Sequence, residues 1–271
     1  MAPSIRVPTA EDFKSLEPAL TVGLHFPSPP ESTTAILILF HGLGDSEAPF
    51  AGFAQSINLP GVMGVSVRGT SPLPPALLGL PPDSGPTMNF HWGDDLNIGS
   101  SGGLDADPGF TKAVDLVLNR LIRETLMEKC GWELSDILFF GYGQGGSLAL
   151  GLASKIREGP QVEEVKEDKD GNPVETGKAF KGVVSVGGDL PPSMIPTLSA
   201  RPKSETPVLI CRGKSCDTVD EDAVDLLKRE FSNVQDVEWN KRDSTMPSSQ
   251  EEVLPMMKFF ADRLRTEPLS L

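Results

Sequence analysis

Ile137-Leu-Phe-Phe140 runs directly into Gly141-Tyr-Gly-Gln-Gly-Gly146, and the helix-compatible run Ser147-Leu-Ala-Leu-Gly-Leu-Ala153 follows. An apolar run that enters a glycine-rich turn and leaves it as a helix is the layout of a nucleophile elbow, with the pattern G-x-S-x-G. The central position of this pattern is Gly143, which has no hydroxyl to attack a carbonyl carbon. The segment therefore predicts the scaffold of a hydrolase and, at the same position, the loss of its nucleophile.

Strand-like and helix-like segments alternate along most of the chain. Strands are expected at 35–40, 63–67, 137–140, 182–186, 208–211 and 237–239, and helices at 50–59, 110–129, 147–153, 220–231 and 254–264. Unbroken apolar runs such as 35–40 are typical of strands that are covered on both faces. The alternation predicts one α/β domain with a mostly parallel central sheet and helices on both faces.

Three segments stand apart from this alternation. Residues 1–33 are rich in proline and polar side chains, so we expect a leader packed on or near a single domain at 34–271. Residues at about 157–179 are charged and poor in apolar side chains, which predicts a flexible acidic insertion on the surface of that domain. Residues 69–109 are crowded with Pro, Gly and Ser, and loops of this length tend to be functional or disordered.

The composition excludes several classes of partner. With 38 acidic and 24 basic residues the net charge is −14, and such a surface repels phosphate backbones, so no nucleic-acid partner is expected. The cysteines Cys130, Cys211 and Cys216 are too few and too scattered for a disulfide framework or a metal site. No apolar run approaches the ~20 residues that span a membrane. Residues 1–6 lack the apolar core of a signal peptide, so we expect a cytoplasmic protein.

Two glycine-rich segments, about 100 residues apart, carry a resemblance to a known family. Ile38-Leu-Phe-His-Gly-Leu-Gly-Asp-Ser46 and Gly141-Tyr-Gly-Gln-Gly-Gly146, with Arg68-Gly-Thr-Ser-Pro-Leu-Pro74 between them, resemble the acyl-protein thioesterase/carboxylesterase (phospholipase/carboxylesterase) family. The similarity runs from about residue 35 to about residue 265. The resemblance implies an α/β-hydrolase fold and hydrolysis of esters and thioesters by a Ser-Asp-His triad, with no metal and no cofactor.

Two of the three roles in that triad are empty in this chain. The nucleophile position is Gly143. Counting back from Glu252, which matches the start of the family's last helix, the base position falls on Met246, and no histidine follows His91. The acid position falls on Asp217, with a shift of one residue. The loss of nucleophile and base together indicates a naturally degenerate site.

The resemblance also implies which groups surround the ligand. In the family an oxyanion hole is made by backbone N–H groups, here those of Leu43 and Gln144, and the replacement of side chains does not remove them. Phe90-His-Trp-Gly-Asp-Asp95 matches an aromatic and acidic segment beside the family's acyl groove. His91 and Trp92 are therefore candidates for lining that groove.

Three functions fit these residues. The leading hypothesis is a ligand-binding or regulatory pseudo-hydrolase that holds an acyl group or another small apolar ligand. The second is a weak, unconventional carboxylic ester or thioester hydrolase that uses the oxyanion hole with His91 as its base. The third is a platform for a protein partner, contacted through residues 69–109 and 157–179. Whether any hydrolysis remains is left open by the sequence.

Overall fold

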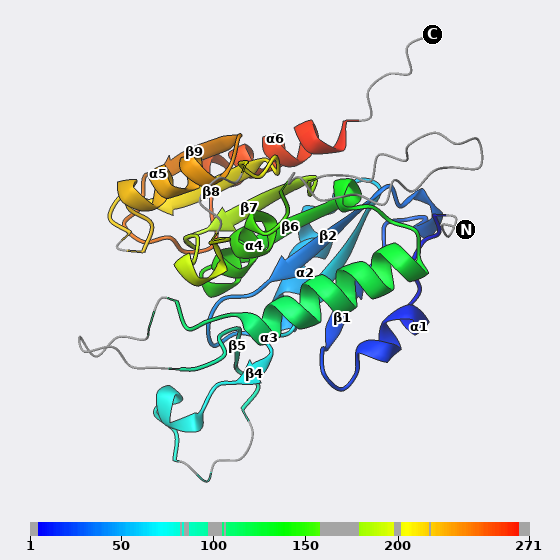
Figure 1. Cartoon of the computed structure of the whole chain (residues 1–271), viewed down its shortest axis with the longest axis horizontal. Helices are drawn as coiled ribbons and strands as arrows, with labels where there is room; N and C mark the ends of the chain where they lie inside the picture. The colour runs from blue at the N-terminus through cyan, green and yellow to red at the C-terminus, as the bar shows by residue number, and fades with distance from the viewer. Residues whose placement is uncertain are drawn as a thin grey trace.

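A seven-stranded sheet forms the centre of the molecule in the computed structural model (Figure 1). The structure describes residues 5–81, 83, 87–96, 105, 107–157, 179–197, 202–216 and 218–265. The sheet order is β1-β3-β2-β6-β7-β8-β9, and β1 pairs antiparallel with β3 whereas every other neighbouring pair is parallel. The strands are β1 (Val22–His25), β2 (Ala35–Phe40), β3 (Val62–Val67), β6 (Ile137–Tyr142), β7 (Gly182–Val186), β8 (Val208–Gly213) and β9 (Val234–Trp239). A separate two-stranded ribbon pairs β4 (Ser71–Pro72) with β5 (Phe90–His91).

Helices cover both faces of the central sheet (Figure 1). The α-helices are α1 (Ala10–Phe13), α2 (Glu47–Ile57), α3 (Thr111–Val114), α4 (Gln144–Ser154), α5 (Glu221–Glu230) and α6 (Gln250–Leu264), and α3 continues as the π-helix η4 (Asp115–Lys129). Short 3-10 turns are η1 (Lys14–Leu16), η2 (Pro30–Ser32), η3 (Pro75–Leu78), η5 (Leu134–Asp136) and η6 (Pro192–Met194). Side chains of α1, η4, α4 and α5 share one hydrophobic core, and those of α2 and α6 share the other. This layout confirms the predicted α/β-hydrolase architecture.

Strand β2 shows why an unbroken apolar run is needed in this sheet. Ile36, Ile38 and Phe40 pack in the core that contains η4, whereas Leu37 and Leu39 pack in the core of α2 and α6. Successive side chains of a strand point to opposite faces, so a strand with a core on each side needs an apolar residue at every position.

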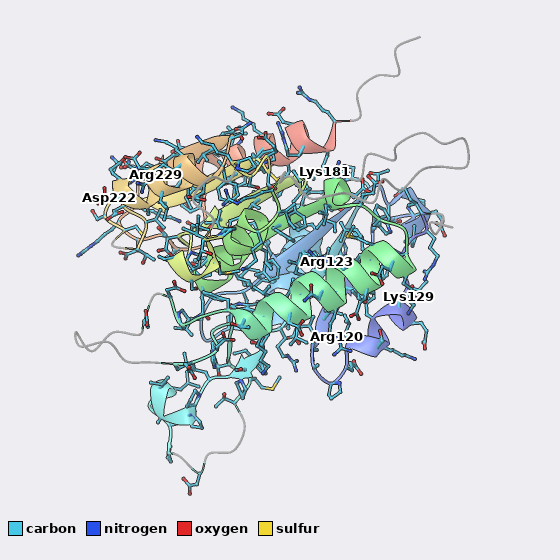
Figure 2. All side chains as sticks on the ribbon, in the orientation of Figure 1. Arg120, Arg123, Lys129, Lys181, Asp222 and Arg229 are labelled. Atoms are coloured by element: carbon cyan, nitrogen blue, oxygen red, sulfur yellow. The ribbon has the colours of Figure 1, made fainter. Side chains whose placement is uncertain are left out.

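The helix predicted at 110–129 is present as α3 and η4. Val117 and Leu121 are fully buried against the sheet, while Arg123 is exposed. Figure 2 shows Arg120 and Arg123 along the outer side of this helix. The alternation of apolar and charged side chains thus places one stripe in the core and leaves the other in solvent.

The segment expected to be a leader contributes to the sheet itself. Strand β1 lies at the edge, where Val22 pairs with Val67. Nearby, Asp12 is almost buried and forms ion pairs with Arg6 at 2.7 Å and Lys129 at 3.2 Å. The Arg6 guanidinium holds the pKa of the Asp12 carboxyl well below its ordinary value. The 157–179 insertion, apart from its two end residues, lies outside the described residues. No helix in the described part of the chain is both long and apolar enough to cross a membrane.

Candidate functional site

A cavity of about 320 Å³ lies at the carboxyl ends of four neighbouring parallel strands, β6, β7, β8 and β9. Its lining comes from the ends of β6 and β7 and from the loops after β8 and β9: Tyr142, Gly143, Gly187, Ser215, Cys216, Thr218, Asp243 and Ser244. In open α/β sheets, ligands bind outside the carboxyl ends of the strands. The fold therefore places this space, called the Gly143 cavity below, where a ligand site is expected.

The turn between β6 and α4 has the backbone conformation of a nucleophile elbow. Gly143 has φ 50° and ψ −122°, a region that residues with a side chain rarely adopt. Its N–H donates to the carbonyl of Val186 at 2.8 Å, and its own carbonyl accepts from the N–H of Ser147 at 3.0 Å. A Cβ atom built on Gly143 has only the Cα of Gly42 near it, at 4.0 Å. The elbow therefore has room for a nucleophile and carries none.

The glycines around Gly143 are required for a different reason. A Cβ on Gly145 would collide with the carbonyl oxygens of Phe40 and His41, and a Cβ on Gly188 would collide with the carbonyl oxygen of Gly143. Backbone runs directly against backbone here, so no side chain fits at Gly145 or Gly188. Close packing at these neighbours fixes the shape of the elbow, independently of what stands at its centre.

The loop after β9 brings different residues to the cavity from the one predicted. Met246, the position assigned to the base, is half-buried against the core of α6 and does not line the cavity. Asp243 and Ser244 line it instead. The N–H of Ser215 donates to the carbonyl of Arg242 at 3.2 Å, which holds the first part of the loop beside the cavity. Counting along the sequence does not reveal this contact between two loops, and the assignment of the base position to Met246 stays a prediction.

None of the three histidines of this chain lines the Gly143 cavity. His25 lies on β1, at the far edge of the sheet. The Nε2 of His41 accepts a hydrogen bond from the N–H of Gly69 at 2.8 Å, so its Nδ1 carries the proton and donates to the carbonyl of Gly42 at 2.7 Å. Burial lowers the pKa of this ring below its ordinary value. His41 is therefore a neutral structural residue with both ring nitrogens occupied.

His91 and Trp92 lie in the interior, so the prediction that they line the groove fails for this cavity. His91 is 5% exposed, and within the described residues its Nδ1 has no hydrogen-bond partner. Burial and the nearby Lys112 lower the pKa of the His91 ring. Trp92 is fully buried, and its Nε1 donates to the carbonyl of His41 at 2.8 Å. The Trp92 backbone N–H donates to Oε1 of Gln144 at 2.8 Å, so this segment is hydrogen-bonded to the residue that follows Gly143.

The two backbone groups assigned to an oxyanion hole are available in the structure. Within the described residues, the N–H groups of Leu43 and Gln144 donate no hydrogen bond. Gln144 is the first residue of α4, whose N-terminus carries a partial positive charge. Their role as an oxyanion hole stays a prediction. Asp217, the position assigned to the acid, lies outside the described residues.

Cys216 is a cavity residue for which the sequence carried no signal. Burial acts to raise the pKa of its thiol, but hydrogen bonds from Ser244 and from Thr218 and Val219 outweigh it and lower the pKa below its ordinary value. The other two thiols behave oppositely: burial raises the pKa of Cys130, and that of Cys211 to about 12. The opposite pKa shifts of these three thiols come from their contacts in the folded structure.

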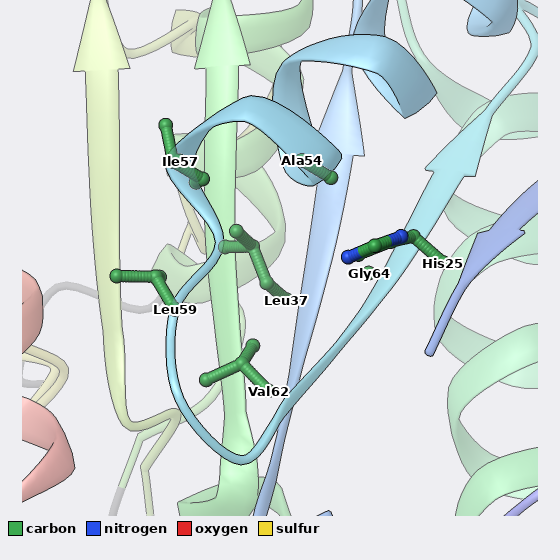
Figure 3. Close-up of a pocket in the computed structure, with 7 residues that line it drawn as sticks. All are labelled: His25, Leu37, Ala54, Ile57, Leu59, Val62 and Gly64. Atoms are coloured by element: carbon green, nitrogen blue, oxygen red, sulfur yellow. The ribbon is translucent and has the colours of Figure 1, made fainter. Parts of the chain in front are cut away.

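A second cavity is too small to hold a ligand. It measures about 10 Å³ and lies between α2 and the sheet, lined by His25, Leu37, Ala54, Ile57, Leu59, Val62 and Gly64 (Figure 3). This is about the space of one water molecule, and its lining is mostly apolar. Among the described residues, no group of three His, Cys, Asp or Glu side chains is placed to bind a metal ion.

Comparison with known proteins agrees with this architecture. The family model described as phospholipase/carboxylesterase matches residues 25–161. An uncharacterised hydrolase of Schizosaccharomyces pombe is 32% identical over 221 residues, which are 80% of this chain and 78% of the relative. The chain therefore belongs to the phospholipase/carboxylesterase family.

Solved structures show the same fold at lower sequence identity. The crystal structure of acyl-protein thioesterase 2 from Zea mays superposes with a TM-score of 0.61 at 21% identity, covering 90% of this chain and 99% of the plant protein. The carboxylesterase of Bacillus cereus gives a TM-score of 0.60 at 16% identity, covering 93% and 98% of the two chains. At these identities the likeness concerns the fold, and the activity must be argued from the site.

Proposed function

We propose that this protein is a pseudo-hydrolase that binds an acyl group or another small apolar ligand in the Gly143 cavity. One observation carries the proposal: the elbow keeps its conformation around a glycine, and every histidine of the chain lies elsewhere. Ester hydrolysis by the family's triad needs a hydroxyl at the elbow and an imidazole beside it. The conformation of the elbow and the absence of a histidine beside it therefore support binding without the proton relay of the family.

The binding elements that remain are backbone groups. The N–H groups of Leu43 and Gln144, which donate no hydrogen bond within the described residues, suit a carbonyl or carboxylate oxygen beside the elbow, and the N-terminus of α4 favours negative charge on that oxygen. Neither residue is among those that line the Gly143 cavity. Hydrolases without a working triad keep roughly 10³–10⁴-fold rate enhancement over water from such groups and from binding. Residual turnover of that size is slow, so the proposal assigns the cavity to binding rather than to catalysis.

The two alternatives have less support. A hydrolase that uses His91 as its base needs that ring in the cavity, but His91 is buried in the ribbon of β4 and β5 and does not line it. A platform for a protein partner would use residues 69–109 and 157–179; part of the first segment and nearly all of the second lie outside the described residues. A cytoplasmic location stays a prediction from the sequence.

Turnover and binding, measured on the same protein, test the proposal. We expect p-nitrophenyl esters from acetate to palmitate to be hydrolysed at the buffer rate, and octanoate to bind in calorimetry. Gly143→Tyr fills the cavity and should abolish binding. Gly52→Tyr is the matched control because Gly52 is exposed on α2 with open space around it. Ester turnover that Gly143→Tyr removes and Gly52→Tyr keeps would overturn the assignment as a pseudo-hydrolase.

A further inference from the structure

The side chains that line the Gly143 cavity are almost all polar. Beside two glycines, the lining consists of Tyr142, Ser215, Cys216, Thr218, Asp243 and Ser244. The part of the lining that the structure describes holds no Leu, Ile, Val, Met or Phe side chain. Sites for small molecules are lined mainly by apolar and aromatic side chains, with a few polar groups that fix orientation. The composition of this lining therefore indicates a polar ligand.

Three of these polar groups find no partner among the described residues. The Tyr142 hydroxyl, the Ser215 hydroxyl and the Asp243 carboxylate make no hydrogen bond and no ion pair there. They come from the end of β6, the loop after β8 and the loop after β9, so they reach the cavity from separate segments. Ser244 is fixed between them, because the N–H of Gly213 donates to its Oγ at 3.0 Å. A ligand thus meets hydrogen-bonding groups of three segments at once.

An alkyl chain does not satisfy these groups. It would displace water from two hydroxyls and a carboxylate without returning a hydrogen bond, and burying polar groups without partners costs free energy. A ligand hydroxyl takes the place of that water, because it can donate to the Asp243 carboxylate and can both donate to and accept from Tyr142 or Ser215. Sites that hydrogen-bond a ligand hydroxyl discriminate strongly against an analogue that lacks it. The lining therefore favours a hydroxylated chain over a plain alkyl chain.

The charges around the cavity set the direction in which such a ligand lies. Asp243 repels a carboxylate placed next to it. Beside the elbow, by contrast, the N–H groups of Leu43 and Gln144 donate no hydrogen bond within the described residues, and the N-terminus of α4 favours negative charge. An acid therefore places its carboxylate beside the elbow, and the rest of its chain extends into the cavity toward Asp243.

From this arrangement we infer that the ligand of the Gly143 cavity is a small polyhydroxy carboxylic acid. The inference rests on the proposed function, since it places the acyl end of the ligand at the elbow, and it narrows the ligand to one whose chain carries hydroxyl groups. At about 320 Å³ the cavity lies at the lower end of the range for ligand sites, which suits a short chain. The acid is bound without reaction, in keeping with the missing triad.

Calorimetry of the full chain, with three probes of equal carbon number, tests this inference. Gluconate carries a carboxylate and hydroxyls, hexanoate carries only the carboxylate, and sorbitol carries only hydroxyls. We expect gluconate to bind at least roughly tenfold more tightly than either of the others, because it alone satisfies both the elbow and the lining. Hexanoate or sorbitol that binds as tightly as gluconate would overturn the inference.

Removal of single hydroxyls shows whether gluconate binds in this cavity. Tyr142→Phe and Ser215→Ala each delete one lining oxygen, so each should weaken gluconate binding about three- to tenfold, and should weaken hexanoate binding less. Ser56→Ala is the matched control, because Ser56 is exposed on α2 and lies outside the cavity. Gluconate affinities that are the same in all three variants as in the natural protein would contradict the inference.

The octanoate titration described for the proposed function separates the two possible failures. If octanoate binds and Gly143→Tyr abolishes this binding, while gluconate binds no more tightly than hexanoate, only the inference falls. If neither octanoate nor gluconate binds, the proposed function falls as well.

Discussion

The β6–α4 turn and the loops after β8 and β9 line the same cavity but differ in how far they are buried. At the turn, backbone lies against backbone, and a Cβ on Gly145 or Gly188 has no room. The loop after β9 also meets backbone, since a Cβ on Gly213 would lie 2.6 Å from the carbonyl oxygen of Arg242, but the outer parts of the two loops are joined by hydrogen bonds between surface residues, and Asp243 stands exposed. Geometry fixed by close packing does not depend on which side chain does the chemistry, whereas surface loops accept substitutions readily. The close packing of the turn therefore explains why the backbone conformation of the elbow is kept although the triad is lost.

The largest effect is expected where the packing of the turn is broken. Gly145→Ala places a methyl group against the carbonyls of Phe40 and His41, and it should lower the free energy of unfolding by about 3 kcal/mol or more. Gly52→Ala is the control, since Gly52 lies in α2 with open space and should gain about 0.5–1 kcal/mol. Urea unfolding measures both. Similar values for the two variants would refute the role assigned to close packing.

Restoring chemistry to the cavity tests the position of the loops. Gly143→Ser combined with Ser244→His supplies a hydroxyl at the elbow and an imidazole on a lining position. We expect turnover of p-nitrophenyl acetate to rise ~10²-fold over the natural protein, equivalent to about 2.7 kcal/mol in the barrier. Gly143→Ser combined with Met246→His should gain much less, because Met246 packs on the α6 core. A larger gain from the Met246 pair would restore the position of the base inferred from sequence.

Positions 244 and 246 also show what could not be predicted from the sequence. The apolar run of β2 and the glycine pattern of the elbow depend on local spacing, and both were predicted at the correct residues. Met246 and Ser244 are two residues apart, and contact with the loop after β8 decides which one reaches the cavity. Such contacts join residues distant in the chain, so no local pattern reports them.

Short and half-buried elements were missed for a related reason. Strand β1 has four residues, all partly exposed, so it lacks the apolar run that revealed β2. Trp92 was expected beside a ligand, but it is fully buried, and its indole N–H donates to the carbonyl of His41. An aromatic side chain in a loop is equally compatible with a groove and with an interior until the partner of its N–H is known.

A smaller effect separates backbone conformation from packing within the turn itself. Gly143→Ala meets open space but must adopt φ 50°, so it should cost about 1–2 kcal/mol of the free energy of unfolding. The measurement is the same urea titration that is used for Gly145→Ala. A cost equal to that of Gly145→Ala would mean that the centre of the elbow is as crowded as its neighbours, and the room claimed for a nucleophile would be lost.

The smallest effect concerns a carboxyl group behind the elbow. Asp189 accepts a hydrogen bond from the Oγ of Ser147 at 3.1 Å. Burial, and repulsion from Asp107 and Asp220, raise the pKa of Asp189 above its ordinary value. The folded state therefore binds this proton more tightly than the unfolded state does. The contribution of Asp189 to stability is present at low pH and is lost as the pH rises through the raised pKa.

Asp189→Asn keeps an acceptor for Ser147 and removes the charge. It should raise the free energy of unfolding at neutral pH, by less than about 1 kcal/mol, and the gain should disappear as the pH falls below the raised pKa. Asp83→Asn is the control for charge alone, since Asp83 is an exposed loop residue in a chain of net charge −14. If both variants gain equally at every pH, the effect comes from net charge. A gain in the free energy of unfolding that only Asp189→Asn shows, and only at neutral pH, would mean that burial beside the elbow disfavours the charged form of Asp189.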